Sequence, residues 1–162
     1  MEIKCLYDEL VDINSLRLHP KNANIHPVDQ VKRLAKILNY QGWRYPVKVS
    51  KRSGLVTSGH GRIEAARINK WPSVPVNFQD YESDDQELAD LHADNAISSW
   101  ADLDFKIINS TMGDFGPDFD IDFLGIKNWA LDLGEKIKEE EKEEETEKIP
   151  KEKKCPSCGY EL

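Results

Sequence analysis

The 162-residue chain lacks long apolar runs, an apolar leader and enough cysteines for a disulfide framework. No run reaches the about 18 consecutive apolar residues that a membrane-spanning helix needs. The segment Met1–Cys5 has no apolar signal core, and three cysteines cannot all pair with one another, so we expect a cytoplasmic protein without disulfides and without a membrane partner. The net charge of −8 excludes a generally basic nucleic-acid coat.

Charge is distributed very unevenly along the chain. Residues 1–78 carry a net charge of +7, residues 79–133 carry −12, and residues 134–154 carry −2. The basic first half indicates either a docking surface for an anion or intramolecular pairing with the acidic half. The sequence alone supports both interpretations.

Apolar periodicity predicts strands that alternate with helices over the first hundred residues. Alternating residues predict strands at 11–16, 46–50 and 55–58, the last two pairing as a hairpin across Ser53-Gly54. Helical spacing predicts helices over 28–40 and 63–69, and a third that starts near Ser83 and buries Leu88, Leu91, His92 and Asn95 on one face. A strand at 74–78 contains a proline, which favours a sheet edge or a strand end.

The second part of the chain is predicted to be an acidic extension, a linker and a tail. Residues 99–133 are interpreted as an acidic helical extension, with Phe105, Ile108 and Met112 facing inward and a segment 118–124 that is either helical or extended. Residues 134–154 consist almost entirely of Glu and Lys without an apolar stripe, which indicates a charged flexible linker.

The tail 155–162 contains a motif of the zinc-knuckle type. Cys155 and Cys158 are separated by two residues, and Gly159 allows the backbone to turn beneath their sulfurs. A structural zinc ion needs four ligands, and Cys5 offers only a third, so a second chain or another protein would complete the site. Sharing the ion would make the protein a homodimer. The alternative is a reduced cysteine pair on a flexible tail.

The segment Ser58-Gly59-His60-Gly61-Arg62 is a candidate phosphate-binding turn between a strand and a helix. The glycines allow the backbone to approach a ligand, and the following helix directs free N–H groups into the turn. Arg62 adds a guanidinium that suits phosphate oxygens, and His60 is a further donor or a candidate catalytic acid or base. The alternative is a plain tight turn in which Arg62 pairs with a nearby acid.

Residues 11–78 resemble the ParB/sulfiredoxin-like domain, which is the N-terminal domain of ParB partition proteins and their phage relatives. The order of strands, helices and loops matches, and the likeness is strongest in residues 45–49, 56–66 and 71–76. The resemblance implies an α/β (α+β) fold over residues 1–98, with a small mixed sheet and flanking helices.

The resemblance also implies a site for a nucleoside triphosphate with magnesium. In the partition proteins the segment that matches Gly59, His60, Gly61 and Arg62 contacts the phosphates of CTP. A later Glu-Asn pair approaches the metal-bound phosphates, and Asp94-Asn95 is similar to that pair. His19, Lys21 and Asn22 fall where the family has its first functional loop.

Three classes of function remain open on this basis. The resemblance implies a ParB-like nucleotide- or phosphate-binding accessory protein in DNA transactions, encoded by a phage or mobile element, with DNA or a DNA-modifying enzyme as a partner. The second class is an enzyme on the same scaffold, either a DNA nuclease or an NTP-dependent phosphotransferase. The third is an interaction adaptor that uses the acidic extension and the knuckle. His60 stands where sulfiredoxins have a reactive cysteine, which excludes sulfinic acid reduction.

Overall fold

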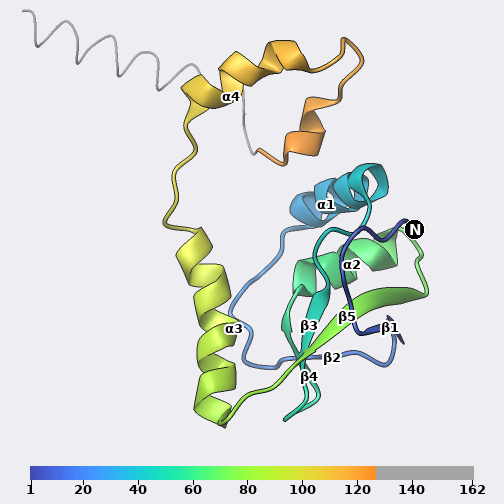
Figure 1. Cartoon of the computed structure of the whole chain (residues 1–162), viewed down its shortest axis with the longest axis vertical. Helices are drawn as coiled ribbons and strands as arrows, with labels where there is room; N and C mark the ends of the chain where they lie inside the picture. Colours follow the sequence, from blue (N-terminus) through green and yellow to red (C-terminus); the bar gives the residue numbers. More distant parts are fainter. Residues whose placement is uncertain (127–162) are drawn as a thin grey trace, which may run out of the picture. The chain divides into compact units, whose positions relative to one another are not determined.

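A five-stranded mixed sheet forms the centre of the computed structural model, which describes residues 1–126 (Figure 1). The strands run in the order β1-β5-β3-β4-β2, with β1/β5 and β3/β4 antiparallel and β3/β5 and β2/β4 parallel. The elements are β1 (Glu9–Asp12), β2 (Arg17–Leu18), α1 (Val28–Gln41), β3 (Val47–Ser50), β4 (Leu55–Ser58), α2 (His60–Ile68), β5 (Ser73–Gln79), α3 (Asp84–Ser98), α4 (Phe105–Thr111), and the 3-10 turns η1 (Met112–Asp114) and η2 (Ile121–Leu124). The expected small mixed sheet with flanking helices is confirmed.

The hydrophobic core lies between one face of the sheet and the helices α1 and α2. Alternate residues of the strands point to this face because a strand has a side-chain period of two. Trp43, which follows α1, and Ile63 of α2 are both fully buried against this face. The core residues from the strands are Val47, Val49, Val56, Val74 and Val76.

Polar residues of β3 and β4 contact α3 and the segment just before it. Ser50 donates to Glu87 (2.6 Å), Lys48 donates to Asp90 (2.9 Å), and Thr57 lies 3.1 Å from the hydroxyl of Tyr81. Leu91 is the fully buried apolar residue of this helix. The start of α3 follows the expectation, because the side chain of Ser83 accepts a hydrogen bond from the amide of Gln86. His92, expected on the buried face, is exposed.

The strand predicted at 11–16 is wrong in extent. The carboxylate of Asp12 accepts a hydrogen bond from the amide of Asn14 (2.7 Å), and the carbonyl of Asp12 accepts one from the amide of Ser15 (3.0 Å). Such Asx turns divert the chain from a strand. The chain therefore leaves β1 after Asp12 and enters β2 only at Arg17, and these two strands lie at opposite edges of the sheet.

The proline of β5 does not mark a sheet edge, because β5 lies between β1 and β3. The parallel ladder with β3 begins at the pair Val47 and Val76, one residue after Pro75. Pro75 itself is paired only with Leu10 of β1. The missing N–H of proline is tolerated there because no strand lies on the β3 side at that residue.

The described part of the acidic extension packs on α1 through η2. Asp122 pairs with Arg33 (3.2 Å) and Lys36 (3.3 Å), and the ring of Phe123 stacks on Tyr40 with centroids 4.1 Å apart. The helix expected over 101–112 is shorter, spanning α4, and the residues expected to face inward are half-buried. The segment 118–124 ends in a 3-10 turn.

Several predictions concern residues beyond those that the structure describes. These are the remainder of the extension 99–133, the linker 134–154, and the tail 155–162 with Cys155 and Cys158. Within residues 1–126, no helix is both long and apolar enough to cross a membrane.

Candidate functional site

The candidate phosphate turn is the start of α2 rather than a loop that precedes a helix. Gly59 adopts a left-handed conformation with φ of +100°, and α2 begins directly at His60, three residues earlier than predicted. No side chain caps this helix start. Within α2, the first amide that donates to a backbone carbonyl is that of Ile63, which donates to the carbonyl of Gly59 (3.0 Å). The amides of the first turn are therefore free donors, as an anion-binding helix start requires.

Arg62 lies folded over Gly59, with its guanidinium turned into the protein. Its Nη2 donates to the carbonyl of Pro46 (3.2 Å), while its Nε is buried without a hydrogen-bond partner. A Cβ on Gly59 would meet Nη2 at 3.1 Å and Nε at 3.2 Å, so the absence of a side chain at Gly59 makes this position available. Burial lowers the pKa of Arg62, and the negative charge of Asp94 opposes that effect.

Of the two α3 residues predicted for the site, Asp94 acts on Arg62, whereas the Asn95 side chain bonds within its own helix. Asp94 accepts a hydrogen bond from Ser58 (2.9 Å), lies 3.9 Å from the amine of Lys48, and acts electrostatically on Arg62. Asn95 donates its side-chain amide to the carbonyl of Leu91 (2.9 Å) within its own helix. The structure thus brings Asp94, but not the amide of Asn95, into the charged group around Arg62.

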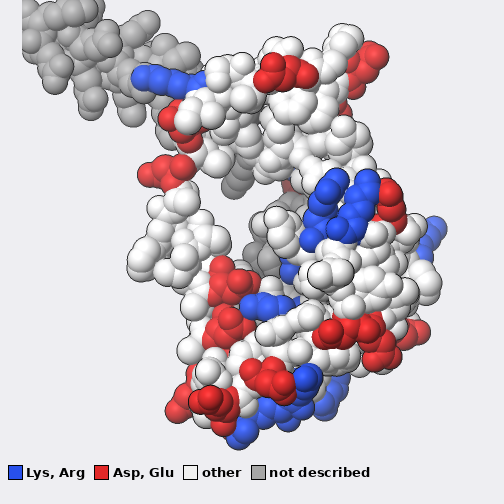
Figure 2. All heavy atoms as spheres, viewed as in Figure 1, with Lys and Arg blue, Asp and Glu red and all other residues white. Residues whose placement is uncertain are grey.

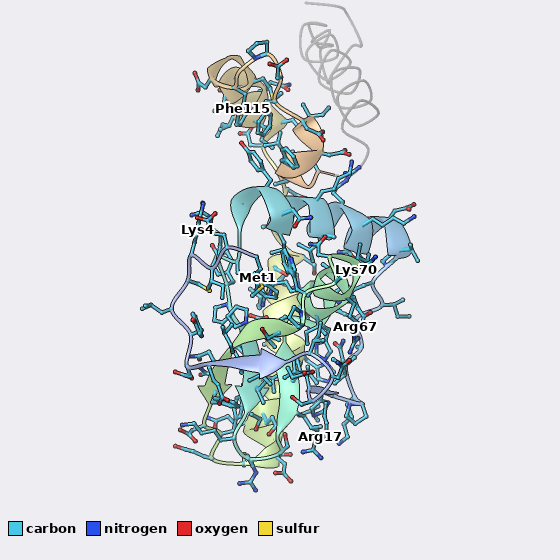
Figure 3. The ribbon with its side chains drawn as sticks, turned by 90° about the vertical axis from the view of Figure 1, so that its right-hand side faces the viewer. Met1, Lys4, Arg17, Arg67, Lys70 and Phe115 are labelled. Carbon is cyan, nitrogen blue, oxygen red and sulfur yellow. The ribbon has the colours of Figure 1, made fainter. Side chains whose placement is uncertain are left out.

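His60 lies on a different side of α2 from Arg62 and borders an open hollow of about 620 Å³. His60 is 8% exposed, and its Nε2 atom is buried without a hydrogen-bond partner. Burial lowers the pKa of His60, and the nearby His26 and His19 lower it further. Figure 3 shows Arg67 between α2 and the chain that connects β2 with α1, at this hollow. The lining residues are Leu18, Asn22, Asn24, His26, Val28, Val31, His60, Glu64, Arg67 and Ile68.

The ring of His26 covers the backbone of α2 at Gly61. A Cβ at Gly61 would lie 3.2 Å from Cε1 of His26 and 3.3 Å from its Nδ1, so glycine provides the space that the imidazole occupies. The Nδ1 atom of His26 lies 3.2 Å from the side-chain oxygen of Gln30, which orients the ring. His26 was not among the predicted site residues, because its position before Pro27 indicated only a helix entry.

The predicted loop residues divide between two environments. Asn22 lines the hollow beside His60. His19 instead faces α3, with its Nε2 3.7 Å from Glu87, and its Nδ1 accepts a hydrogen bond from the amide of Lys21 (3.1 Å). Lys21 itself is exposed.

A second polar cluster, which the sequence did not reveal, joins α3 to the sheet. Glu87 is 4% exposed and accepts hydrogen bonds from Ser50 and Ser53, each at 2.6 Å. Burial acts to raise the pKa of Asp90, but hydrogen bonds from Lys48 and Tyr81 outweigh it and lower that pKa. Burial and the hydrogen bond to Asp90 raise the pKa of Tyr81 to about 12. The sequence did not indicate that Glu87 is buried, because acidic residues in a helix usually face solvent.

Ion pairs between the two halves of the chain account for much of the charge asymmetry. Lys48 pairs with Asp90, Lys51 with Asp80, and Arg52 with Asp84. Figure 2 shows acidic and basic side chains lying next to one another on the viewed face. The interpretation that the acidic half neutralises the basic half is therefore confirmed for these pairs. Among the described residues no group of three or more His, Cys, Asp or Glu could hold a metal ion.

Comparisons with known proteins agree with this architecture, although no family model matches the chain. The ParB-like nuclease domain-containing protein YnaK of Escherichia coli (strain K12) is 33% identical over 75 residues, which are 46% of this chain and 82% of that protein. The chain belongs to the ParB-like nuclease domain family. The resemblance noted in the sequence is thereby confirmed.

A solved structure shares the fold of this ParB-like domain at low sequence identity. The C-terminally truncated chromosome-partitioning protein ParB from Caulobacter crescentus, complexed with CTP-γ-S, matches with a TM-score of 0.57 and 16% identity, over 74% of this chain and 71% of that one. The Pnob8-like ParB-N domain matches with a TM-score of 0.42 and 16% identity, over 99% of this chain and 58% of that one.

Proposed function

We propose that this ParB-like domain binds the phosphates of a nucleoside triphosphate at the start of α2, as an accessory protein in DNA transactions. The observation that carries the proposal is the uncapped helix start behind Gly59, with the Arg62 guanidinium folded over the glycine and its Nε unpartnered. Free amides and a buried guanidinium together suit an anion. The amides belong to His60, Gly61 and Arg62.

The identity of the ligand as a nucleotide is supported by the fold relative. The Caulobacter crescentus ParB structure contains CTP-γ-S, and its fold is that of this chain. Magnesium would be held mainly by the phosphates and water, with Asp94 offering one carboxylate, because Mg²⁺ at nucleotide sites commonly uses only one or two protein carboxylates. Asn95 would need to release its bond to Leu91 before contacting the ligand.

Calorimetry with CTP, ATP and ADP in the presence of magnesium tests the proposal. We expect one of them to bind the full chain and Arg62→Ala to weaken that binding at least tenfold. Arg62→Lys keeps the charge but loses the fork geometry, so it should bind with intermediate affinity. Arg52→Ala, which removes an exposed arginine paired with Asp84 at the β3–β4 turn, is the matched control. Absence of binding by all three nucleotides, or equal binding by Arg62→Ala that circular dichroism shows to be folded, would overturn the proposal.

A further inference from the structure

The side of α1 that faces away from the sheet carries a row of cations. Lys36 follows Lys32 by four residues and Arg33 by three, so the three side chains share one face of the helix. Tyr40, four residues further on, lies on the same face. Figure 2 shows Lys and Arg side chains gathered over α1. Like charges at this spacing disfavour a helix slightly, so helix formation does not account for the row. The α1 basic face comprises Lys32, Arg33, Lys36 and Tyr40.

An acidic side chain of the extension already lies on this face. The two carboxylate oxygens of Asp122 in η2 lie 3.2 Å from Nη2 of Arg33 and 3.3 Å from Nζ of Lys36. The carboxylate thus bridges two cations, as the oxygens of a phosphate group would. All three side chains are partly exposed, so the pairs contribute little to stability and another anion can compete for the cations.

The next residue of η2 makes the contact that a nucleobase would make. Phe123 stacks on Tyr40, with the ring centroids 4.1 Å apart and the ring planes 2° from parallel. Tyr40 remains 56% exposed beside this ring. Asp122 and Phe123 therefore place a carboxylate on cations and, one residue later, a ring on an aromatic side chain. Proteins that bind single-stranded nucleic acid contact a phosphate and its base with the same pair of groups.

We propose that the α1 basic face binds single-stranded nucleic acid, and that Asp122 and Phe123 cover this face in the places of one phosphate and its base. A strand that displaces them would set a phosphate between Arg33 and Lys36 and stack a base on Tyr40. Duplex nucleic acid offers the phosphates without the stack, because its bases are paired. The proposal does not rest on nucleotide binding at the start of α2, because none of these residues belongs to that site.

Fluorescence anisotropy of the full chain with a labelled oligothymidine of about 12 nucleotides tests the cover first. Phe123→Ala removes the stack without changing the charge, and we expect it to tighten binding at least threefold. Asp122→Asn removes the competing charge and should also tighten binding. Ile121→Ala removes an exposed apolar residue of the same turn, and Asp85→Asn removes an exposed acid of α3. Both are controls that should bind like the wild type.

The face itself is tested in the Phe123→Ala chain, in which the cover is released. There Lys36→Gln should weaken binding at least threefold and lower the log–log slope of the salt dependence by about 0.7, the contribution of one phosphate contact. Tyr40→Leu should weaken binding about fivefold or more because it loses a stacked base, whereas Tyr40→Phe should not. Lys51→Gln, which removes an exposed lysine paired with Asp80 at the β3–β4 turn, is the control for Lys36. A duplex of the same length should bind more weakly than the single strand.

Each part of the proposal has a result that overturns it. If neither Phe123→Ala nor Asp122→Asn binds the oligonucleotide more tightly than the wild type, the segment does not cover the face. If no chain binds it, if Lys36→Gln and Tyr40→Leu bind as tightly as their parent chain, or if the duplex binds as tightly as the single strand, the surface is not a single-strand site. None of these results bears on nucleotide binding at the start of α2, which Arg62→Ala tests separately.

Discussion

Gly59 is the residue at which β4 turns directly into α2. A Cβ there would be strained by the φ of +100° and would press on Arg62 and on Val47 Cγ2 at 3.2 Å. We expect Gly59→Ala to lower the free energy of unfolding by about 1–3 kcal/mol, the range for a strained backbone position. Urea denaturation measures this loss.

Gly113 provides the matched control for this substitution. A Cβ on Gly113 would meet no heavy atom within 4 Å. Gly113→Ala should therefore change the free energy of unfolding by no more than about 0.5 kcal/mol. Equal stability of the Gly59→Ala variant and the wild type would show that the turn does not need glycine.

His60 should make the stability of the domain depend on pH near neutrality. Burial lowers its pKa in the folded state below the value of about 6.5 expected for the unfolded chain. The unfolded state therefore binds more protons, and stability should be full above pH 6.5 and fall as the pH drops below it. Urea denaturation between pH 7.5 and 5, in chloride buffers, should show this loss. His60→Gln should flatten it, and a slope like that of the wild type would contradict the assignment.

At the scale of single elements, α3 is attached to the sheet mainly by hydrogen bonds. Glu87 accepts from Ser50 and Ser53, and Ser50 Oγ also accepts from the amides of Arg52 and Ser53. Glu87→Ala would leave two serine hydroxyls without their acceptor. We expect it to lower the free energy of unfolding by about 2–3 kcal/mol, because buried polar groups that lose their partners are costly.

Glu82, which is exposed and precedes the cap residue Ser83 of α3, is the control for Glu87. Glu82→Ala removes the same charge and should change stability by at most about 0.5 kcal/mol. Chemical denaturation followed by tryptophan fluorescence measures both variants. Equal effects of the two substitutions would mean that the buried hydrogen bonds of Glu87 contribute nothing.

The elements also show what sequence patterns can and cannot predict here. The helix over α1, the β3–β4 hairpin and the Ser83 cap follow from local periodicity and turn chemistry, and the structure confirms them. The start of α2 was misplaced because the conformation of Gly59, rather than any apolar pattern, decides where that helix begins. For α3, periodicity correctly placed Leu91 on the buried face, but it misplaced the exposed His92 and missed the buried Glu87, since this helix also docks on polar strand residues.

The candidate site was only partly predictable for a related reason. The turn residues Gly59 and Arg62 are recognisable from their types and spacing. His60 and Arg62 lie on different sides of α2 because they are two residues apart in a helix of about 3.6 residues per turn. The contact of His26 with Gly61 instead depends on how the loop 19–27 packs. Packing between segments distant in sequence leaves no local signal, so His26 could not be assigned to the site.

At the scale of the described chain, the acidic extension is held to the sheet domain mainly through η2. The stack of Phe123 on Tyr40 contributes about 0.5–1.5 kcal/mol beyond the area it buries, and the exposed ion pairs of Asp122 contribute little. We expect Phe123→Ala to speed proteolytic cleavage within 99–125 while the thermal midpoint of the sheet domain shifts by no more than about 2 °C. Asp122→Asn should have a smaller effect, and unchanged cleavage in Phe123→Ala would contradict this attachment.

The central claim is that the start of α2 holds the phosphates of a nucleotide, and amide NMR of the full chain with CTP and magnesium tests it most directly. The account predicts that the largest shift changes fall on the amides of His60, Gly61 and Arg62, and that they disappear in Arg62→Ala but persist in Arg52→Ala. Changes confined to other segments, or no changes with CTP, ATP or ADP, would contradict it.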